Sequence, residues 1–327
     1  MADPTPTARQ LVIRTPAKVN LGLRVLSRRA DGYHAVRTLL AGVDLWDTLT
    51  FEPRGDGLRL ECDTPSIPTD QTNLVLRAAS RLEEWLGRRL PGTAIRLQKG
   101  IPAGRGLGGG SSDAAAALVG LNCLFRLGLG RHELHGLLSE VGMDAPYFLY
   151  GGLALATGRG EQVFPLADSP ELPLVLLVPD FGISTPDAYR GLPPPAAAPA
   201  GDHGSERTRS LVRFLESGPT GPQPSRKLLA GCFPNDLERS TVLQTTRPPE
   251  AISRMRSTLK AAGAVETAMS GSGSAVFGVF PDRERATHAA SRLSGANLRA
   301  IATRTITRSE HRAALLGTGP DGAWPRG

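Results

Sequence analysis

The chain of 327 residues is long enough for two hydrophobic cores, and its 40% apolar and 21% charged residues exclude a disordered or fibrous protein. The net charge of +7 comes almost wholly from arginine, with 34 Arg to 4 Lys, and the basic residues are scattered, which argues against a nucleic-acid-binding arm. Because the chain has no run of 18 apolar residues and no apolar N-terminal segment, we expect no membrane partner, no signal peptide and a cytoplasmic location.

Hydrophobic periodicity in the first half predicts strands mixed with helices. Strands are expected on both sides of Pro16 and further along, at Leu11–Ile13, Val19–Leu26, Thr48–Glu52, Leu58–Glu61 and Ala94–Gln98. Apolar residues at helical spacing predict a helix over Asn73–Leu86, with Asn73 as its N-cap. The alanine-rich segment Ser111–Leu124 is expected to be a second helix, capped by Ser111 or Ser112.

The second half continues the same mixture. Residues 193–224, rich in Pro, Ala, Gly and Ser, indicate a surface insertion, and residues 318–327 indicate a terminal tail. Strands are expected at Gly151–Thr157, Leu174–Val178, Ser274–Phe280 and Arg299–Thr307, and helices at Pro249–Ala262 and Arg283–Leu293. Since these elements alternate without a regular βαβ period, the sequence favours an α+β fold.

A glycine-rich loop is the most informative segment. Five glycines occur within residues 104–110, and two serines follow at the expected start of a helix. Glycines allow backbone conformations that a Cβ forbids, and the first amides of a helix are unpaired and partly positive, so together they suit a di- or triphosphate. The candidate ATP-binding residues are therefore Pro102, Ala103, Gly104, Arg105, Gly106, Leu107, Gly108, Gly109, Gly110, Ser111 and Ser112.

Other interpretations of the loop are weaker. Gly104, Gly106 and Gly109 match the dinucleotide pattern G-x-G-x-x-G, but no acidic residue follows about 20 positions later to bind a ribose. No P-loop motif occurs in the chain, and a purely structural glycine turn remains an alternative. The sequence H-E-x-H at residues 132–135 is one residue short of the zinc-protease spacing, so we expect no protein metal site.

Three motifs in order resemble those of the GHMP kinases, the superfamily of galactokinase, homoserine kinase and mevalonate kinase. They are PAKVNLGL from residue 16, PAGRGLGGGSSDAAA from residue 102, and MSGSGSAVFGVF from residue 269. The resemblance implies a ribosomal-S5-like N-terminal lobe over residues 1–167 and an α/β C-terminal lobe over 168–317, with ATP and substrate between them.

Within this superfamily the chain is most similar to the 4-diphosphocytidyl-2-C-methyl-D-erythritol kinases. The likeness rests on RADGYHAVRTLL from residue 29, MDAPYFLYGGLALATGRGE from residue 143, STPDAYRGL from residue 184 and NDLE from residue 235. It implies ATP and Mg²⁺ as cofactors, a small-molecule substrate with a cytidine diphosphate group, and transfer of phosphate to its 2-hydroxyl in isoprenoid precursor synthesis. We expect a monomer or a weak homodimer.

The resemblance also implies roles for individual residues. Asp144 matches the catalytic aspartate and Lys18 the lysine beside it, while Asn20 would contact the substrate. The remaining matches are Tyr33, His34, Thr185 and Tyr189 for the cytidine, Gly271 and Gly273 for the second glycine loop at the substrate, and Lys99 and Asn73 near the ATP. Arg105 departs from the family pattern, in which a small residue stands between the glycines.

Two alternatives stay open. Instead of the cytidine-directed kinase, the chain could be a GHMP kinase of another specificity, such as the homoserine or mevalonate type. The other alternative is a nucleotide-binding regulator without turnover. In the first case the aromatic residues at 33 and 34 would not matter for activity; in the second, Lys18 and Asp144 would have no catalytic use.

Overall fold

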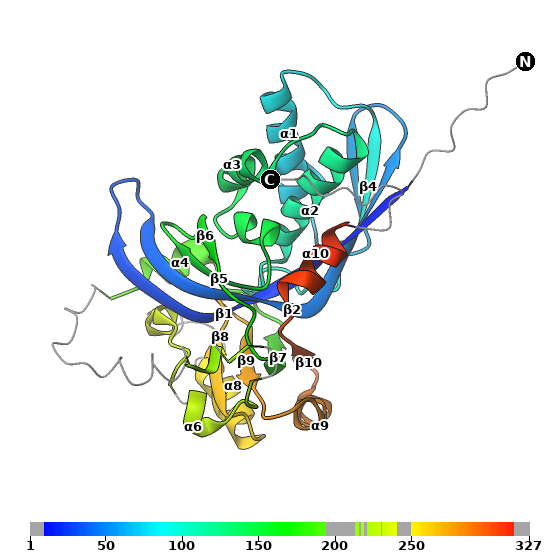
Figure 1. Cartoon of the computed structure of the whole chain (residues 1–327). Helices are drawn as coiled ribbons and strands as arrows, with labels where there is room; N and C mark the ends of the chain where they lie inside the picture. The colour runs from blue at the N-terminus through cyan, green and yellow to red at the C-terminus, as the bar shows by residue number, and fades with distance from the viewer. Residues whose placement is uncertain are drawn as a thin grey trace, which may run out of the picture.

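The computed structural model describes residues 10–193, 213–215, 217–218, 221–229, 231–240 and 250–316. Two β-sheets organise an α+β fold, one of six strands from the first half of the chain and one of four strands from the second (Figure 1). Most of the expected insertion over 193–224 and the expected tail lie outside the described residues. None of the helices in the described ranges combines the length and hydropathy that a membrane crossing requires.

Two long antiparallel strands, β1 (Leu11–Arg28) and β2 (His34–Pro53), form the backbone of the first sheet. The prediction of two short strands around Pro16 was wrong, because the strand continues through the proline. Pro16 pairs with Trp46 directly before a register shift, and such an irregularity is where a sheet tolerates a residue without an amide hydrogen. The sheet is completed by β3 (Leu58–Cys62), β4 (Thr93–Gln98), β5 (Leu153–Thr157) and β6 (Gln162–Pro165).

Helices pack on this sheet and enclose the larger hydrophobic core. Asn73 caps the first helix by accepting a hydrogen bond from the Val75 amide, which confirms that prediction. Within the central helix, a Cβ at Gly120 would overlap the buried ring of Phe51, so the glycine permits close packing of helix on sheet. The helices are α1 (Leu74–Leu86), α2 (Gly109–Leu124), α3 (Arg131–Val141) and the 3₁₀ helix η1 (Ala145–Leu149).

The start of α2 differs from the expectation. The helix begins at Gly109, and Gly108 stands at the N-cap in the left-handed conformation, with φ at 76°. Neither Ser111 nor Ser112 is the cap, so that prediction was wrong. A glycine replaces the usual hydrogen-bonding cap here because the backbone must turn through a region that side chains disfavour.

The second sheet has the order β10-β7-β9-β8 and carries its own helices. Its central strand β7 (Pro173–Pro179) is buried at every position, and the predicted strand over Ser274–Phe280 is confined to β9 (Val276–Val279). The other elements are β8 (Glu266–Met269), β10 (Leu298–Arg304), α4 (Thr185–Arg190), α6 (Arg226–Leu229), η2 (Asp236–Arg239), α8 (Ala251–Ala261) and α9 (Arg283–Leu293).

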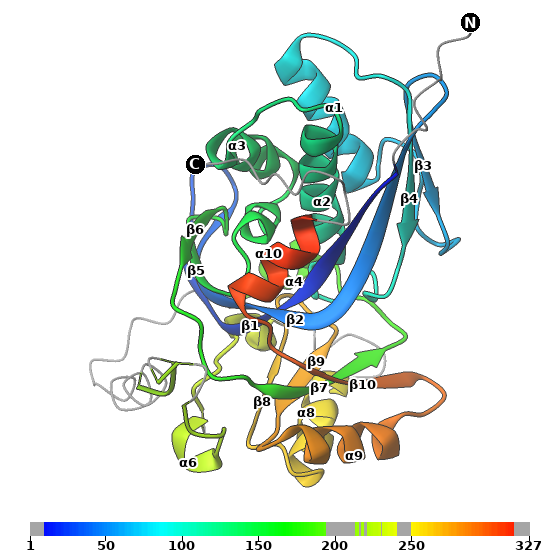
Figure 2. The same ribbon diagram turned by 45° about the vertical axis from the view of Figure 1, so that its right-hand side comes forward.

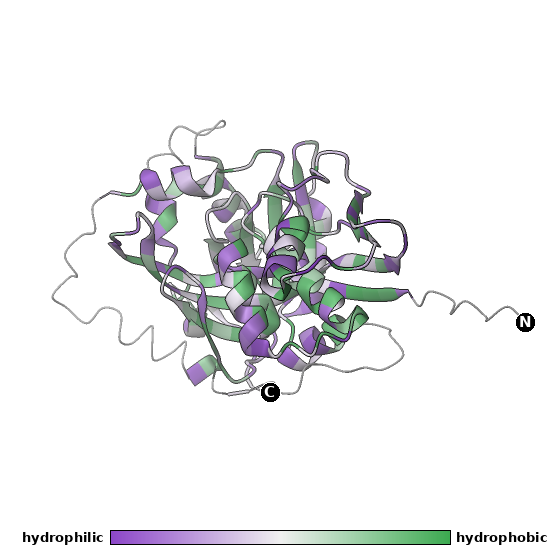
Figure 3. Cartoon of the chain, turned by 90° about the horizontal axis from the view of Figure 1, so that it is seen from above, coloured by the Kyte–Doolittle hydropathy of each residue, from purple (hydrophilic) through white to green (hydrophobic). Residues whose placement is uncertain are grey.

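The last helix, α10 (Arg308–Leu316), returns from the second sheet to the first lobe, where Figure 2 shows it in red beside α2 and β1. Leu315 belongs to the larger core, and a Cβ at Gly42 in β2 would lie 3.0 Å from the Ile306 side chain. The sequence pattern did not predict this helix, and the lobe boundary expected at residue 167 stays a prediction. Coloured by hydropathy, the long strands are largely hydrophobic and the polar residues gather on outer helices and loops (Figure 3).

Candidate active site

A cavity of about 1180 Å³ is lined by residues of both lobes. Strands of the first sheet, the glycine-rich loop, the residues just before η1, α4, η2 and the loop before β9 all contribute to its wall. The predicted site residues that line it are Lys18, Asn20, Tyr33, His34, Pro102, Gly104, Arg105, Gly106, Leu107, Gly108, Gly109, Gly110, Ser111, Asp144, Thr185, Tyr189, Gly271 and Gly273. Segments far apart in the sequence therefore meet at one cavity.

At the centre of the wall, Lys18 and Asp144 form an ion pair with 3.1 Å between Nζ and Oδ2. The lysine side chain is 2% exposed, and the aspartate is 36% exposed at the cavity. Lys18 Nζ also donates to Asn20 Oδ1 at 2.6 Å and to the Gly106 carbonyl at 3.0 Å. The Asp144 carboxylate, which is open to the cavity beside this ammonium, can accept a hydrogen bond from a bound hydroxyl.

Asn20 is fixed in turn by its own partner. Its Nδ2 donates to Thr38 Oγ1 at 2.8 Å, and Thr38 Oγ1 donates to the Gly22 carbonyl at the same distance. Since the carboxamide donor is used in this way, its oxygen faces the lysine. Asn20 is thus placed to orient Lys18 as well as to line the cavity.

The glycine-rich loop packs directly against the loop that precedes β9. Gly106 has φ at +77°, and a Cβ on it would overlap the carbonyl oxygen of Ser270. Ser270 Oγ donates to the Gly106 carbonyl at 2.9 Å, and the Ala275 amide donates to the Arg105 carbonyl at 3.0 Å. The two glycine-rich loops therefore form one continuous part of the cavity wall.

The start of α2 gives this wall its donors. Gly108, Gly109, Gly110 and Ser111 all line the cavity, and the first amides of a helix have no intrahelical acceptor. A helix of 16 residues also places partial positive charge at its N-terminus. This arrangement suits a phosphate group.

Aromatic side chains line the part of the cavity contributed by the β1–β2 turn and α4. His34 and Tyr189 are stacked, with 5.2 Å between ring centroids and 28° between planes. Tyr33 is 49% exposed, and the Arg159 guanidinium lies 5.2 Å from the centroid of its ring. Burial and the nearby Arg28 lower the pKa of His34, so its imidazole is neutral near pH 7 and offers one donor and one acceptor.

Four predicted contacts are not brought to the cavity: Asn73, Lys99, Ala103 and Ser112. The Asn73 side chain is occupied as the cap of α1, and Ser112 Oγ donates to the Pro16 carbonyl at 2.6 Å. Lys99 is buried between Asp47 and Asp113, at 2.5 and 2.7 Å. The side chains of Asn73, Lys99 and Ser112 are thus occupied by partners within the protein, and Ala103 is exposed.

The Arg105 side chain reaches from the glycine-rich loop to the second lobe. Its guanidinium donates to the carbonyls of Pro179 and Asp180, at 3.1 and 2.8 Å, just after β7. The arginine that departs from the family pattern thus fastens the loop to the second lobe. The residue also lines the cavity, with its guanidinium held at the edge by these two carbonyls.

The second glycine loop is held from below by Asn235. Its Nδ2 donates to the carbonyls of Met269 and Gly271, both at 2.8 Å, while its Oδ1 caps η2 by accepting from the Leu237 amide. On the cavity side, the hydroxyls of Thr185 and Ser272 are 2.7 Å apart. Hydrogen bonds from α4 and η2 therefore fix this loop.

Sequence reasoning missed several cavity residues. Four arginines that were read only as scattered charge, Arg28, Arg159, Arg190 and Arg239, line the cavity. Periodicity gave no signal for them because they come from separate turns and helix ends. Arg159 and Arg190 are paired with Glu161 and Asp187, and guanidinium groups of this kind suit an anionic ligand.

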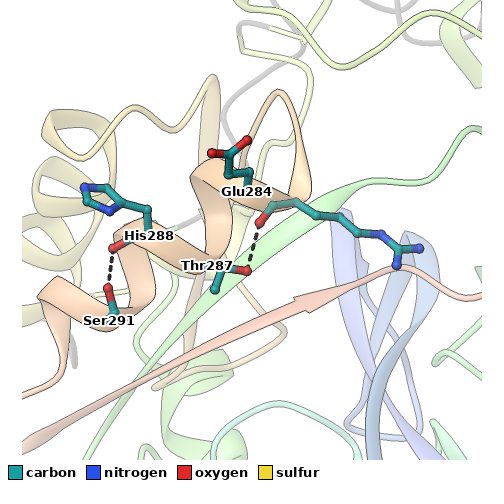
Figure 4. Close-up of a pocket in the computed structure, with 5 residues that line it drawn as sticks. Glu284, Thr287, His288 and Ser291 are labelled. Carbon is teal, nitrogen blue, oxygen red and sulfur yellow. Dashed lines mark hydrogen bonds between the residues drawn. The ribbon is translucent and has the colours of Figure 1, made fainter.

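No cluster of three or more His, Cys, Asp or Glu side chains suited to a metal ion occurs among the described residues. Outside the main cavity, a shallow hollow lies along one face of α9, where Thr287 Oγ1 and Ser291 Oγ donate to carbonyls of their own helix (Figure 4). These two hydroxyls are therefore satisfied within the helix itself.

Comparison with known proteins agrees with this geometry. The family models for the GHMP kinases N-terminal domain and the GHMP kinases C-terminal domain match residues 73–152 and 226–299. The 4-diphosphocytidyl-2-C-methyl-D-erythritol kinase of Moorella thermoacetica is 41% identical over 298 residues, which cover 90% of this chain and 99% of that protein.

Solved structures show the same relationship. A 4-(cytidine 5'-diphospho)-2C-methyl-D-erythritol kinase superposes with a TM-score of 0.72 at 36% identity, covering 90% of this chain and 99% of the other. Homoserine kinase from Cytophaga hutchinsonii, at 19% identity and a TM-score of 0.69 over 94% and 98% of the two chains, shares the fold. The chain belongs to the GHMP kinases and, within them, to the family of 4-diphosphocytidyl-2-C-methyl-D-erythritol kinases.

Proposed function

We propose that the protein transfers the γ-phosphate of ATP to the 2-hydroxyl of 4-diphosphocytidyl-2-C-methyl-D-erythritol. The observation that carries this proposal is the Lys18–Asp144 ion pair, which lies beside a glycine-rich helix N-terminus in a cavity that also holds aromatic side chains. Phosphoryl transfer depends on alignment and charge stabilisation, and these groups supply both.

Asp144 accepts the hydrogen bond of the attacking hydroxyl in this proposal. Its carboxylate is open to the cavity, and its other neighbour is the buried ammonium of Lys18. As the hydroxyl oxygen attacks the γ-phosphorus, its proton passes to Asp144, the bond from that phosphorus to the β–γ bridging oxygen breaks, and ADP leaves. Lys18 stabilises negative charge on the transferring phosphate.

The phosphates of ATP bind to the amides at the start of α2. Mg²⁺ prefers oxygen ligands and usually keeps few protein ligands when phosphates are present. The hydroxyl of Ser111 is an oxygen donor in the cavity wall, and the absence of a metal-binding cluster among the described residues is compatible with an ion held mainly by the nucleotide. When bound, the ion would neutralise phosphate charge.

The cytosine base binds among Tyr33, His34 and Tyr189. Their rings offer flat apolar surfaces, and the neutral imidazole of His34 supplies a donor and an acceptor for the base edge. A homoserine or mevalonate type of GHMP kinase has no use for such a group of rings.

Release of ADP, measured over a panel of acceptors, tests the proposal. The panel contains the cytidine-linked diol, its uridine counterpart, homoserine and mevalonate. We expect turnover with the cytidine compound and a loss of at least tenfold in kcat/KM for it in Tyr33→Leu, while Trp85→Leu, an exposed aromatic on α1, stays unchanged. Equal turnover with homoserine or mevalonate would reject the substrate, and no ADP release with any acceptor would favour a regulator.

A further inference from the structure

Asn235, the first residue of the NDLE motif, is buried and does not line the active-site cavity, yet it holds the second glycine loop. Its Nδ2 donates to the carbonyls of Met269 and Gly271, at 2.8 Å each. These carbonyls belong to the residues on either side of Ser270. Glu238, at the other end of the motif, accepts from the Met269 amide at 2.8 Å. The backbone around Ser270 is therefore fixed on both sides from η2.

Ser270 and Gly271 connect this loop to the lysine of the proposed reaction. Ser270 Oγ donates to the Gly106 carbonyl at 2.9 Å, and the same carbonyl accepts from Lys18 Nζ at 3.0 Å. Gly271 packs on the ammonium, because a Cβ at this glycine would lie 3.2 Å from Lys18 Nζ and 3.1 Å from Asn20 Oδ1. The position of the ammonium thus depends on groups that the second glycine loop holds in place.

The 3₁₀ helix η2 is itself anchored on the strand that carries this lysine. The Leu23 amide donates to the Pro234 carbonyl at 2.8 Å, and the Val25 amide donates to Asp236 Oδ2 at 2.9 Å. Both amides belong to β1, as Lys18 does. Residues 234–238 therefore join this strand to the loop that packs on its ammonium.

The oxygen and the nitrogen of the Asn235 carboxamide bind different groups. Oδ1 accepts from the Leu237 amide at 3.0 Å and so caps η2. Nδ2 carries two hydrogens, one for each loop carbonyl. An ionised carboxylate in this position would keep the capping oxygen but would offer no donor to the loop. The contact with the loop can therefore be removed while the cap is retained.

We propose that Asn235 is a positioning residue for phosphoryl transfer, an inference that rests on the proposed function. Its carboxamide fixes Ser270 and Gly271, and these two residues fix the Lys18 ammonium beside the transferring phosphate. Phosphoryl transfer depends on alignment, and a displacement of about 1 Å can lower a rate on the order of 10²-fold. Loss of the carboxamide should therefore lower kcat. The KM for the cytidine compound should change little, since the aromatic side chains come from the β1–β2 turn and α4.

Asn235→Asp tests the proposal, with Asn122→Asp as its matched control. Asn122 is also buried, and its Nδ2 donates to the Leu129 carbonyl while its Oδ1 accepts from the Leu129 amide, both at 3.0 Å. It lies in α2 and does not line the cavity. Both variants should be less stable in urea unfolding. Only Asn235→Asp should lower kcat, by about 10- to 100-fold, with the KM for the cytidine compound within about threefold of wild type.

A spectroscopic measurement makes the test independent of turnover. The chain has four lysines, and the ¹⁵N signal of Lys18 Nζ is assigned by its loss in Lys18→Met. This signal should shift in Asn235→Asp and stay in place in Asn122→Asp. If wild type releases no ADP with the cytidine compound, the proposed function fails, and the Lys18 signal alone decides whether Asn235 positions the lysine.

If Asn235→Asp does not fold, Asn235→Ser is compared with Asn122→Ser, because serine keeps a capping oxygen without the carboxamide donors. An unchanged kcat in the Asn235 variant, an equal fall in kcat in the control, or a change confined to KM would overturn the proposal. An unmoved Lys18 signal would overturn it as well.

Discussion

Lys18 and Asp144 face each other across the boundary between β1 and η1, with 3.1 Å between the ammonium nitrogen and a carboxylate oxygen. The buried lysine is held by Asn20 and by the carbonyl of Gly106, so the position of the pair depends on the glycine-rich loop. The proposed acid–base group and the proposed phosphate-binding loop are therefore parts of one hydrogen-bonded unit.

Replacement of Asp144 by Asn should lower kcat by about 10²- to 10⁴-fold, because the amide cannot take the proton of the attacking hydroxyl. ATP affinity should change little, since the amides of α2 are retained. Steady-state kinetics and an ATP titration check both statements. Asp282→Asn, at the N-cap of α9, is the matched control, and turnover of the Asp144 variant within a few-fold of wild type would contradict the assignment.

Two glycines of the same loop offer a matched comparison. Both have positive φ, but a Cβ at Gly104 would meet nothing within 4 Å, whereas a Cβ at Gly106 would overlap the Ser270 carbonyl. Gly104→Ala should therefore lower the free energy of unfolding by about 1–2 kcal/mol, because only the left-handed backbone conformation disfavours the alanine. Gly106→Ala should lower it by about 2–5 kcal/mol, because overpacking against the second loop adds to the same backbone strain.

Urea unfolding measures these two costs, and kcat/KM for ATP should fall at least tenfold in Gly106→Ala only. Equal effects of the two substitutions on stability and activity would show that the contact between the two loops is unimportant.

Lys99→Met should destabilise the protein by about 3–5 kcal/mol, because it leaves two buried carboxylates without their cation. Burial raises the pKa of Asp113, although the nearby ammonium of Lys99 opposes this shift. Burial alone would lower the pKa of Lys99, but the two carboxylates outweigh it and the pKa of Lys99 is raised. Chemical denaturation with Lys260→Met on α8 as the control measures the cost. A raised KM for ATP with unchanged stability would instead support the direct ATP contact that the sequence suggested.

His311 should make stability depend on pH. Burial and Arg308 lower its pKa from 6.5 to about 4, so the folded protein holds a neutral ring while the unfolded chain protonates it below pH 6.5. Stability should therefore fall as the pH drops from 6.5 to 4, by up to about 3 kcal/mol from this group. The decrease in unfolding free energy between pH 7.5 and pH 4.5 should be smaller in His311→Asn than in wild type or in His288→Asn. The same decrease in all three proteins would refute this prediction.

Local signals in the sequence predicted the parts of the fold that local forces determine. Asn73 was recognised as a helix cap because its side chain bonds within the first turn of the helix that it begins. Residues at strand spacing and the alanine-rich helix were also found, and three ordered motifs indicated the family that the comparisons confirm.

Features that depend on distant partners were missed or misplaced. Lys99 looked like a nucleotide contact, yet Asp47 and Asp113 bury it, and only the folded chain brings these three residues together. Pro16 looked like a strand end, but the register shift in the β1–β2 pair accommodates it. Helix α10 was not predicted because its apolar face is defined by packing on the first lobe.

A crystal structure with a non-hydrolysable ATP analogue and the cytidine-linked diol gives the sharpest test of the proposed reaction. The triphosphate should lie against the amides between residues 104 and 112, with the 2-hydroxyl of the diol within hydrogen-bonding distance of the Asp144 carboxylate. A triphosphate bound elsewhere, or a hydroxyl that faces away from Asp144, would contradict it.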